Sequence, residues 1–210
     1  MAILQGNQGQ TGKQMGQNIT ASLGEFSEQL MTELQSRYYQ QTYRGNKFTA
    51  TFTAAATAAA STSALCVLLN PISSGKNLIF TDAFVALTGY TAQTLAGSSL
   101  VLGYSAAAIL PTTVGTAIAT QNCLLGSGAA SVAKAYVSAT LGVAPVAVRQ
   151  LAAWALGTAT PGADVVSGVH DDIGGAVILT PGNCIALFGL GGTPADLTVQ
   201  TTLTWDEVYI

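Results

Sequence analysis

The chain ends in the stretch DLTVQTTLTWDEVYI, residues 196–210, in which two kinds of side chain alternate. The first kind comprises Leu197, Val199, Thr201, Leu203 and Trp205, and the second comprises Thr198, Gln200, Thr202 and Thr204. A period of two predicts a β-strand with one apolar and one polar face. The polar face carries threonine and glutamine and no charge, which raises the question of what it contacts.

The composition of the chain is poor in charge. Of its 210 residues, 49% are hydrophobic and 8% are charged, and the net charge is -3. An ordinary soluble domain has roughly 25% charged residues. No basic cluster is present to bind nucleic acid or an anionic membrane, so we expect neither as a partner. Such a bland surface favours aggregation of a free monomer, and we expect copies of the chain or another protein to cover it.

The sequence predicts two parts, residues 1–47 and residues 48–210. The first part opens with a Gln-, Gly- and Asn-rich arm that shows no periodicity. An amphipathic helix is expected next, ended by Gly45 and Asn46. Its apolar face comprises Leu23, Phe26, Leu30 and Leu34. These four side chains are the candidate partner-binding residues, and packing on the chain's own second part is the alternative.

The second part reads as many short strands separated by Gly- and Pro-rich turns. A turn over residues 70–77 separates two strands, and the run from Leu78 to Leu87 is apolar enough for a buried strand. The clearest hairpin joins residues 176–179 to residues 184–187 through Thr180-Pro181-Gly182-Asn183, in which glycine suits the third position of a type II turn. These patterns predict a mainly β fold, an antiparallel jelly-roll-like β-sandwich.

Residues that carry chemistry are scarce. His170 stands beside Asp171 and Asp172, but nothing else in the sequence completes a metal site, and we expect a loop without a catalytic role. Asp206 and Glu207 are adjacent, so they seldom face one cleft. Cys66, Cys123 and Cys184 lack zinc-site spacing and are expected as buried free thiols in strands. The sequence predicts no enzyme, cofactor or metal, and no signal peptide, which favours folding in a reducing cytoplasm.

Several stretches resemble structural proteins of tailed bacteriophages: YRGNKFTATF, LLNPISSGKNLIFTDAFVA, GGAVILTPGNCIALFG and LTVQTTLTWDEVYI. The resemblance covers roughly residues 43–210. It implies a virion structural protein with a jelly-roll-like domain, of the capsid decoration or cement type. Such proteins are commonly trimers that bind the major capsid protein on the capsid surface after assembly in the host cytoplasm. The threonine face is then an interface, or it is an exposed face on which threonine simply favours strands.

Other functions compete with a capsid cement protein. A tail-fibre, head-fibre or baseplate protein would use the β-domain to bind a receptor or glycan, and so would a carbohydrate-binding β-sandwich from outside a virus. Both would favour exposed aromatic side chains with carboxylates nearby. The candidates in the sequence are Trp154 and the run from His170 to Asp172.

Overall fold

The computed structural model describes residues 5–7, 18–20, 38–55, 62–90, 97–104, 115–155, 167–191 and 197–210. The chain divides into two compact units, residues 1–40 and 41–210. This division falls ahead of the predicted boundary after Lys47, because Lys47 is already the first residue of a sandwich strand.

The first unit contains a short antiparallel pair of strands, β1 (Gln5–Asn7) and β2 (Asn18–Thr20). The sequence predicts an extended or flexible arm, and these two segments are extended. Their backbone groups pair with each other, which hydrophobic periodicity does not reveal. The stripe of Leu23, Phe26, Leu30 and Leu34 lies outside the described residues.

The helix α1 (Tyr39–Tyr43) ends where the sequence predicts a stop. Gly45 adopts a φ of 72°, in the left-handed region that glycine tolerates best. Its N–H donates to the carbonyl of Thr42 at 2.9 Å, and the N–H of Asn46 donates to the carbonyl of Gln41 at 3.0 Å. This pair of bonds is the Schellman motif, which satisfies the last carbonyls of a helix.

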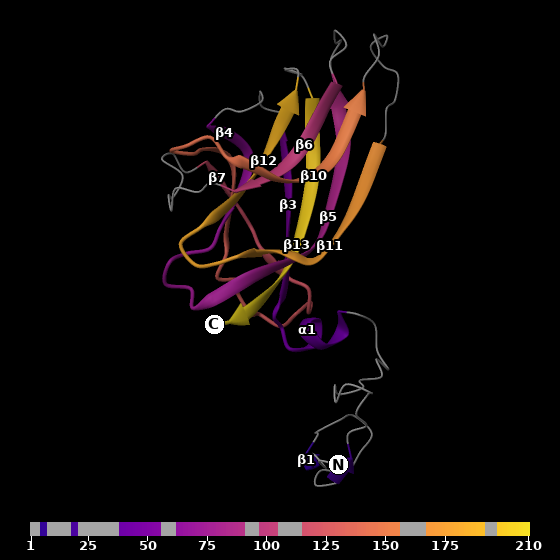
Figure 1. The fold of residues 1–210 in the computed structure, drawn as a ribbon, viewed down its shortest axis with the longest axis vertical. Coiled ribbons are helices and arrows are strands. Elements are labelled where there is room, and N and C mark those ends of the chain that lie inside the picture. Colours follow the sequence, from indigo (N-terminus) through magenta and orange to yellow (C-terminus); the bar gives the residue numbers. More distant parts are fainter. Residues whose placement is uncertain are drawn as a thin grey trace. The chain divides into compact units, whose positions relative to one another are not determined.

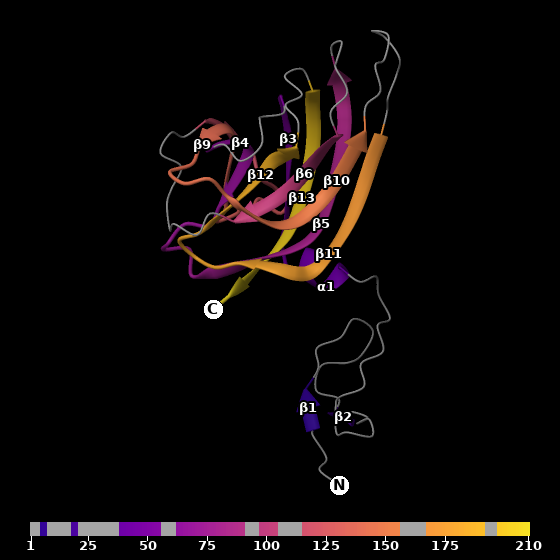
Figure 2. The same ribbon diagram turned by 45° about the horizontal axis from the view of Figure 1, so that its top comes forward.

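The second unit consists of two packed antiparallel sheets (Figures 1 and 2). In order across the sheet, the five-stranded sheet comprises β11 (Ser167–Leu179), β5 (Lys76–Tyr90), β13 (Leu197–Tyr209), β3 (Lys47–Ala55) and β8 (Gln121–Asn122). The six-stranded sheet comprises β10 (Val146–Ala155), β6 (Gly97–Tyr104), β12 (Cys184–Gly191), β4 (Ser63–Leu69), β9 (Lys134–Thr140) and β7 (Thr116–Ile118). The predicted mainly β antiparallel sandwich is confirmed.

The eight long strands pair in a nested order. β3 pairs with β13, β4 with β12, β5 with β11, and β6 with β10. The segment between β6 and β10 contributes the strands at the opposite edge of each sheet. There β9 pairs with β4, and β8 pairs with β3. The first long strand therefore lies beside the last, the second beside the last but one, and so on inward.

The main core lies between the two sheets, and the five-stranded sheet contributes largely alternate residues to it. β4 and β12 of the six-stranded sheet are buried on both faces, and their other side contributes to a second apolar cluster. Val199, Thr201, Leu203 and Trp205 of β13 are all buried, which confirms the alternation predicted for this strand. The ring of Trp205 stacks on that of Phe48 with centroids 6.4 Å apart. Each such large side chain contributes roughly 1.5–3 kcal/mol by burial.

The predicted hairpin over residues 176–187 is wrong, although its turn is real. Gly182 has a φ of 81°, as the third position of a type II turn requires. The strands on either side do not pair with each other: β11 pairs with β5, whereas β12 pairs with β4 and β6 in the other sheet. The turn therefore crosses between sheets, because each strand buries its apolar face by joining a different layer of the same core. The turn from β4 to β5 also crosses.

Candidate functional site

The polar side of β13 forms, with β3, a threonine-rich part of the outer face of the five-stranded sheet. Thr49, Thr51 and Thr53 lie opposite Thr204, Thr202 and Gln200 in register. The hydroxyl oxygens of Thr51 and Thr202 lie 3.0 Å apart, and the Thr49 hydroxyl donates to the carbonyl of Leu203 at 3.1 Å. Paired hydroxyls of this kind stabilise neighbouring strands without charge. The contact between Thr51 and Thr202 explains in part why the polar face of β13 carries threonine in place of charged residues, since the two hydroxyls bind each other across the strands.

The other part of this outer face carries Phe84 on β5 and His170 on β11, which lie opposite each other. His170 was predicted in a loop, and that prediction is wrong because the run pairs with β5 as part of β11. The Nε2 atom of His170 lies 3.3 Å from Oδ1 of Asp82. Asp171, the next residue, instead pairs with Arg149 of the other sheet, with Nε to Oδ2 at 2.6 Å.

The run from His170 to Asp172 therefore does not converge on one point. Within the part of the chain that the structure describes, no group of three or more His, Cys, Asp or Glu side chains is placed to hold a metal ion. Arg149 and Asp171 form a two-bond contact that links β10 to β11 at the edge of the sandwich. Its second bond runs from Nη2 of Arg149 to Oδ1 of Asp171 at 2.8 Å. The contact is structural, because it joins the two sheets.

The pKa values of Asp171 and Asp206 depart from the ordinary aspartate value in opposite directions. The hydrogen bond from Arg149 lowers the pKa of Asp171, so its stabilisation is present above the ordinary aspartate pKa and is lost as the pH falls through the lowered value. Burial raises the pKa of Asp206, partly offset by Lys47, so its contribution is largest at low pH and is lost as the pH rises through the raised value.

Carbon-detected NMR of the side-chain carboxyls would measure both transitions. We expect Asp206 to titrate at a higher pH than Asp171. In the variant Arg149→Met the Asp171 transition should move up toward its ordinary value while that of Asp206 stays in place. Asp171 titrating at or above the pH of Asp206 in the unaltered protein would contradict the described geometry.

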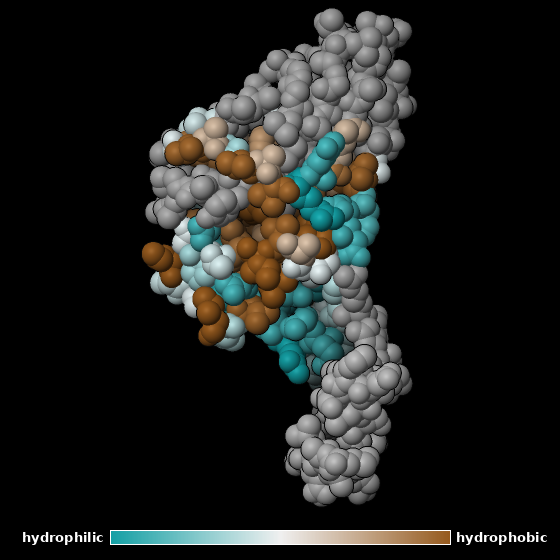
Figure 3. Space-filling model, viewed as in Figure 1, coloured by the Kyte–Doolittle hydropathy of each residue, from teal (hydrophilic) through white to brown (hydrophobic). Residues whose placement is uncertain are grey.

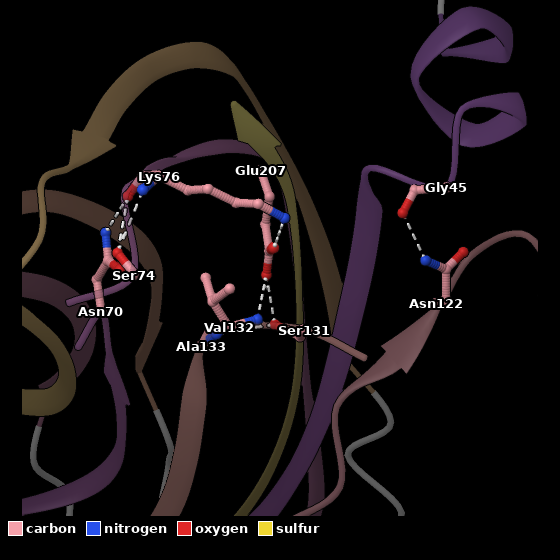
Figure 4. A network of polar contacts seen from close by, with 9 residues as sticks. All are labelled: Gly45, Asn70, Ser74, Lys76, Asn122, Ser131, Val132, Ala133 and Glu207. Carbon is pink, nitrogen blue, oxygen red and sulfur yellow. Dashed lines mark hydrogen bonds and ion pairs between the residues drawn. The ribbon is translucent and has the colours of Figure 1, made fainter. Parts of the chain in front are cut away.

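A buried network of charges holds one end of the sandwich (Figure 4). The side chain of Glu207 is fully buried, and its Oε2 lies 3.0 Å from Nζ of Lys76. Its other oxygen accepts from the Ser131 hydroxyl at 2.6 Å and from the Val132 N–H at 2.9 Å. The carboxylate thus joins the end of β13 to the start of β5 and to the segment before β9, and these contacts offset the cost of burying its charge.

Asp206 belongs to a second buried pair. Its Oδ1 lies 3.5 Å from Nζ of Lys47, which also donates to the Thr81 hydroxyl at 2.7 Å. Asp206 and Glu207 thus have different partners, and they do not form a carboxylate pair facing one cleft.

Asn70 binds the two turns that cross between the sheets. Its side-chain amide donates to the carbonyls of Lys76 at 2.8 Å and Leu179 at 2.9 Å. Its backbone N–H donates to the carbonyl of Asn183 at 2.9 Å, and its own carbonyl accepts from the N–H of Gly182 at 2.8 Å. Figure 4 shows the Asn70 side chain beside Lys76. One fully buried residue therefore fixes the β4–β5 turn against the β11–β12 turn.

Next to this network the sandwich exposes Ile72, Tyr209 and Ile210, which we call the terminal surface. Their exposed fractions are 85%, 76% and 78%. Tyr209 is held by Lys76, whose Nζ lies 4.9 Å from the ring centroid, and the Ile210 N–H donates to the carbonyl of Gly75 at 3.2 Å. Figure 3 shows that hydrophobic residues also occupy much of the described surface on the face it displays. Exposed apolar side chains on a fixed backbone are typical of a protein contact surface.

Sequence reasoning missed the two buried ion pairs. A usable signal was present, because Asp206 and Glu207 directly follow the buried Trp205, and Lys47 directly precedes the buried Phe48. In a strand this poor in charge, a charged residue next to the core residues points to a buried partner.

The three cysteines are all free. Cys66 in β4 and Cys184 in β12 are buried as predicted, and burial raises the pKa of both thiols. Cys123 is half-buried and follows β8, so the predicted burial in a strand is wrong for it. The side chain of Trp154, a candidate for glycan binding, lies outside the described residues.

Comparison with known proteins identifies no relative: no family model, curated protein or solved structure matches the chain. Among the helices that the structure describes, none is both long and apolar enough to span a membrane.

Proposed function

We propose that the protein is a non-enzymatic virion structural protein, a capsid cement protein that binds the major capsid lattice and stabilises the head. The observation that carries the proposal is that the surface of the sandwich is poor in charge and exposes large apolar side chains. Soluble proteins usually expose many charged side chains. This sandwich instead exposes the terminal surface and the uncharged threonine-rich part of the outer face on β3 and β13. Such surfaces favour permanent burial against other protein.

The order of the strands supports the same proposal. We infer that the sandwich is a jelly roll, because the nested pairing of β3 with β13 through β6 with β10 is what a long antiparallel ribbon gives when it rolls into two sheets. Jelly rolls are a common architecture of viral capsid domains, and also of lectins. The support is architectural, since one fold hosts many functions.

The two parts of the chain that the sequence predicts then have separate roles. The sandwich forms a homotrimer, in which the terminal surface of each copy is buried against its neighbours. Residues 1–46 attach the trimer to the capsid protein through the apolar stripe of Leu23, Phe26, Leu30 and Leu34. Each large apolar side chain buried on the capsid contributes roughly 1.5–3 kcal/mol, so the stripe supplies much of the binding free energy.

The attachment is tested by adding purified protein to particles that lack it. We expect the double variant Phe26→Ala/Leu30→Ala to bind at least tenfold more weakly, because two large apolar side chains no longer reach the capsid. Glu28→Ala removes a side chain from the same segment outside the stripe and should bind as the unaltered protein does. Unchanged binding of the double variant would refute the anchor, and a large fall in its melting temperature would assign the stripe to the sandwich instead.

A further inference from the structure

The outer face of the five-stranded sheet presents an aromatic ring whose tip lies over a glycine. Phe84 of β5 is 45% exposed although it stands in the middle of a sheet. A Cβ atom added to Gly168 on β11 would lie 2.9 Å from Cζ of Phe84 and 3.3 Å from its Cε2. The tip of the ring therefore lies over Gly168, so the side chain leans across β11. Nearly half of Phe84 stays open to solvent in this position.

Polar side chains stand on both sides of this ring. Thr202 lies opposite Phe84 on β13, and His170 lies opposite it on β11. Cross-strand neighbours of this kind have Cβ atoms about 5 Å apart, within reach of one small ligand. The imidazole of His170 is 60% exposed in its side chain, and its Nε2 lies 3.3 Å from the carboxylate of Asp82. Hydroxyl, imidazole and carboxylate groups thus offer both donors and acceptors around the ring.

We propose that this aromatic platform, made of Phe84 with Gly168, Thr202, His170 and Asp82, binds a pyranose unit of a neutral glycan. The electron-rich face of an aromatic ring attracts the polarised C–H groups on the apolar face of a sugar, while the rim of hydroxyls needs hydrogen-bonding partners at its sides. The platform supplies both. Asp82 already contacts His170, which favours a neutral ligand over a charged one. A quaternary ammonium ligand is disfavoured, because such cations are bound in cages of several aromatic rings.

Gly168 has a specific role in this site. An alanine at this position would place its Cβ 2.9 Å from Cζ of Phe84, so the ring would have to move from its position over the sheet. A displaced ring loses the position in which a sugar can stack on it between the neighbouring polar groups. The binding of a glycan does not depend on the proposed capsid role, since the platform lies around Phe84 in the middle of β5 and on the paired residues of β11 and β13, whereas the terminal surface lies at the end of β13 and in the β4–β5 turn.

The test is an NMR titration of the full chain with cellohexaose and, separately, with chitohexaose, two neutral β-linked oligosaccharides. We expect shifts of the amide signals of His170 and Thr202 with a dissociation constant of about 1 mM for at least one of them. Phe84→Leu keeps an apolar side chain but removes the ring, and it should weaken binding at least tenfold. Gly168→Ala keeps the ring but displaces it, and it should weaken binding severalfold. Val148→Ala, an exposed position on β10 in the other sheet, should bind normally.

Two results would overturn the proposal. One is the absence of shifts around Phe84 with both oligosaccharides at concentrations up to about ten times the expected dissociation constant. The other is binding by Phe84→Leu as strong as that of the unaltered protein. The amide spectrum of each variant reports whether it is folded, and a Gly168→Ala variant that does not fold leaves Phe84→Leu to decide.

Discussion

Replacing Glu207 by alanine is expected to lower the free energy of unfolding by about 3–5 kcal/mol, the usual loss when one partner of a buried ion pair is removed. The carboxylate is fully buried and has three partners: Lys76, Ser131 and the N–H of Val132. Without it, the ammonium group of Lys76 stays in a mostly buried position with no opposite charge. The Ser131 hydroxyl and the Val132 N–H lose their acceptor as well. Urea unfolding at neutral pH measures the loss.

A second variant separates the charge from the packing. Changing both partners, Lys76→Met and Glu207→Leu, removes the two charges together and should recover a large part of the lost stability, since no unpaired charge is left. Asp172→Ala serves as the control, because Asp172 is exposed on β11 and its replacement should change the free energy of unfolding by less than about 1 kcal/mol. A loss below about 1 kcal/mol for Glu207→Ala would mean that the network in Figure 4 does not hold this end of the sandwich.

Asn70→Ala is expected to cost about 2–4 kcal/mol, because each buried carbonyl that loses its donor costs roughly 1–3 kcal/mol. The side chain donates to the carbonyls of Lys76 and Leu179, which belong to the two different sheet-crossing turns. Removing it breaks the side-chain link between the two turns and leaves only the backbone bonds of residue 70, so the ends of β5 and β11 should also exchange their amide hydrogens faster.

The matched control for Asn70 is Asn183→Ala. The amide of Asn183 also binds within a turn, to the Thr180 hydroxyl at 2.8 Å, but this contact is exposed to solvent. Its loss should cost less than about 1 kcal/mol, since water replaces the missing partner. Equal losses for the two variants would show that Asn70 acts as an ordinary turn residue and does not join the sheets.

Local patterns in the sequence predicted the strands better than their pairing. The alternation along β13 is a direct consequence of one buried face, so it could be read from that segment alone. The same reasoning failed for the turn at Gly182. The conformation of the turn depends on four residues, whereas the layer that each flanking strand joins depends on β5, β4 and β6, far away along the chain.

Residues whose environment depends on distant partners were the hardest to predict. Lys47 and Asp206 are 159 positions apart, and neither shows by itself that it is buried. The run from Leu78 to Leu87 was interpreted as a buried strand, but β5 turns Phe84 outward. Its ring is accommodated there because Gly168 lies beneath it on β11. The candidate glycan platform therefore depends on a pair of residues that only the fold brings together.

The mass of the full chain in solution shows whether this charge-poor sandwich exists as an assembly of copies. Multi-angle light scattering during gel filtration at micromolar concentration should give three times the mass of one chain. The variant Ile72→Asp, which places a charge on the terminal surface, should shift the protein toward smaller species. A stable, soluble monomer for the unaltered protein would refute the homotrimer, because its surface would then need no partner.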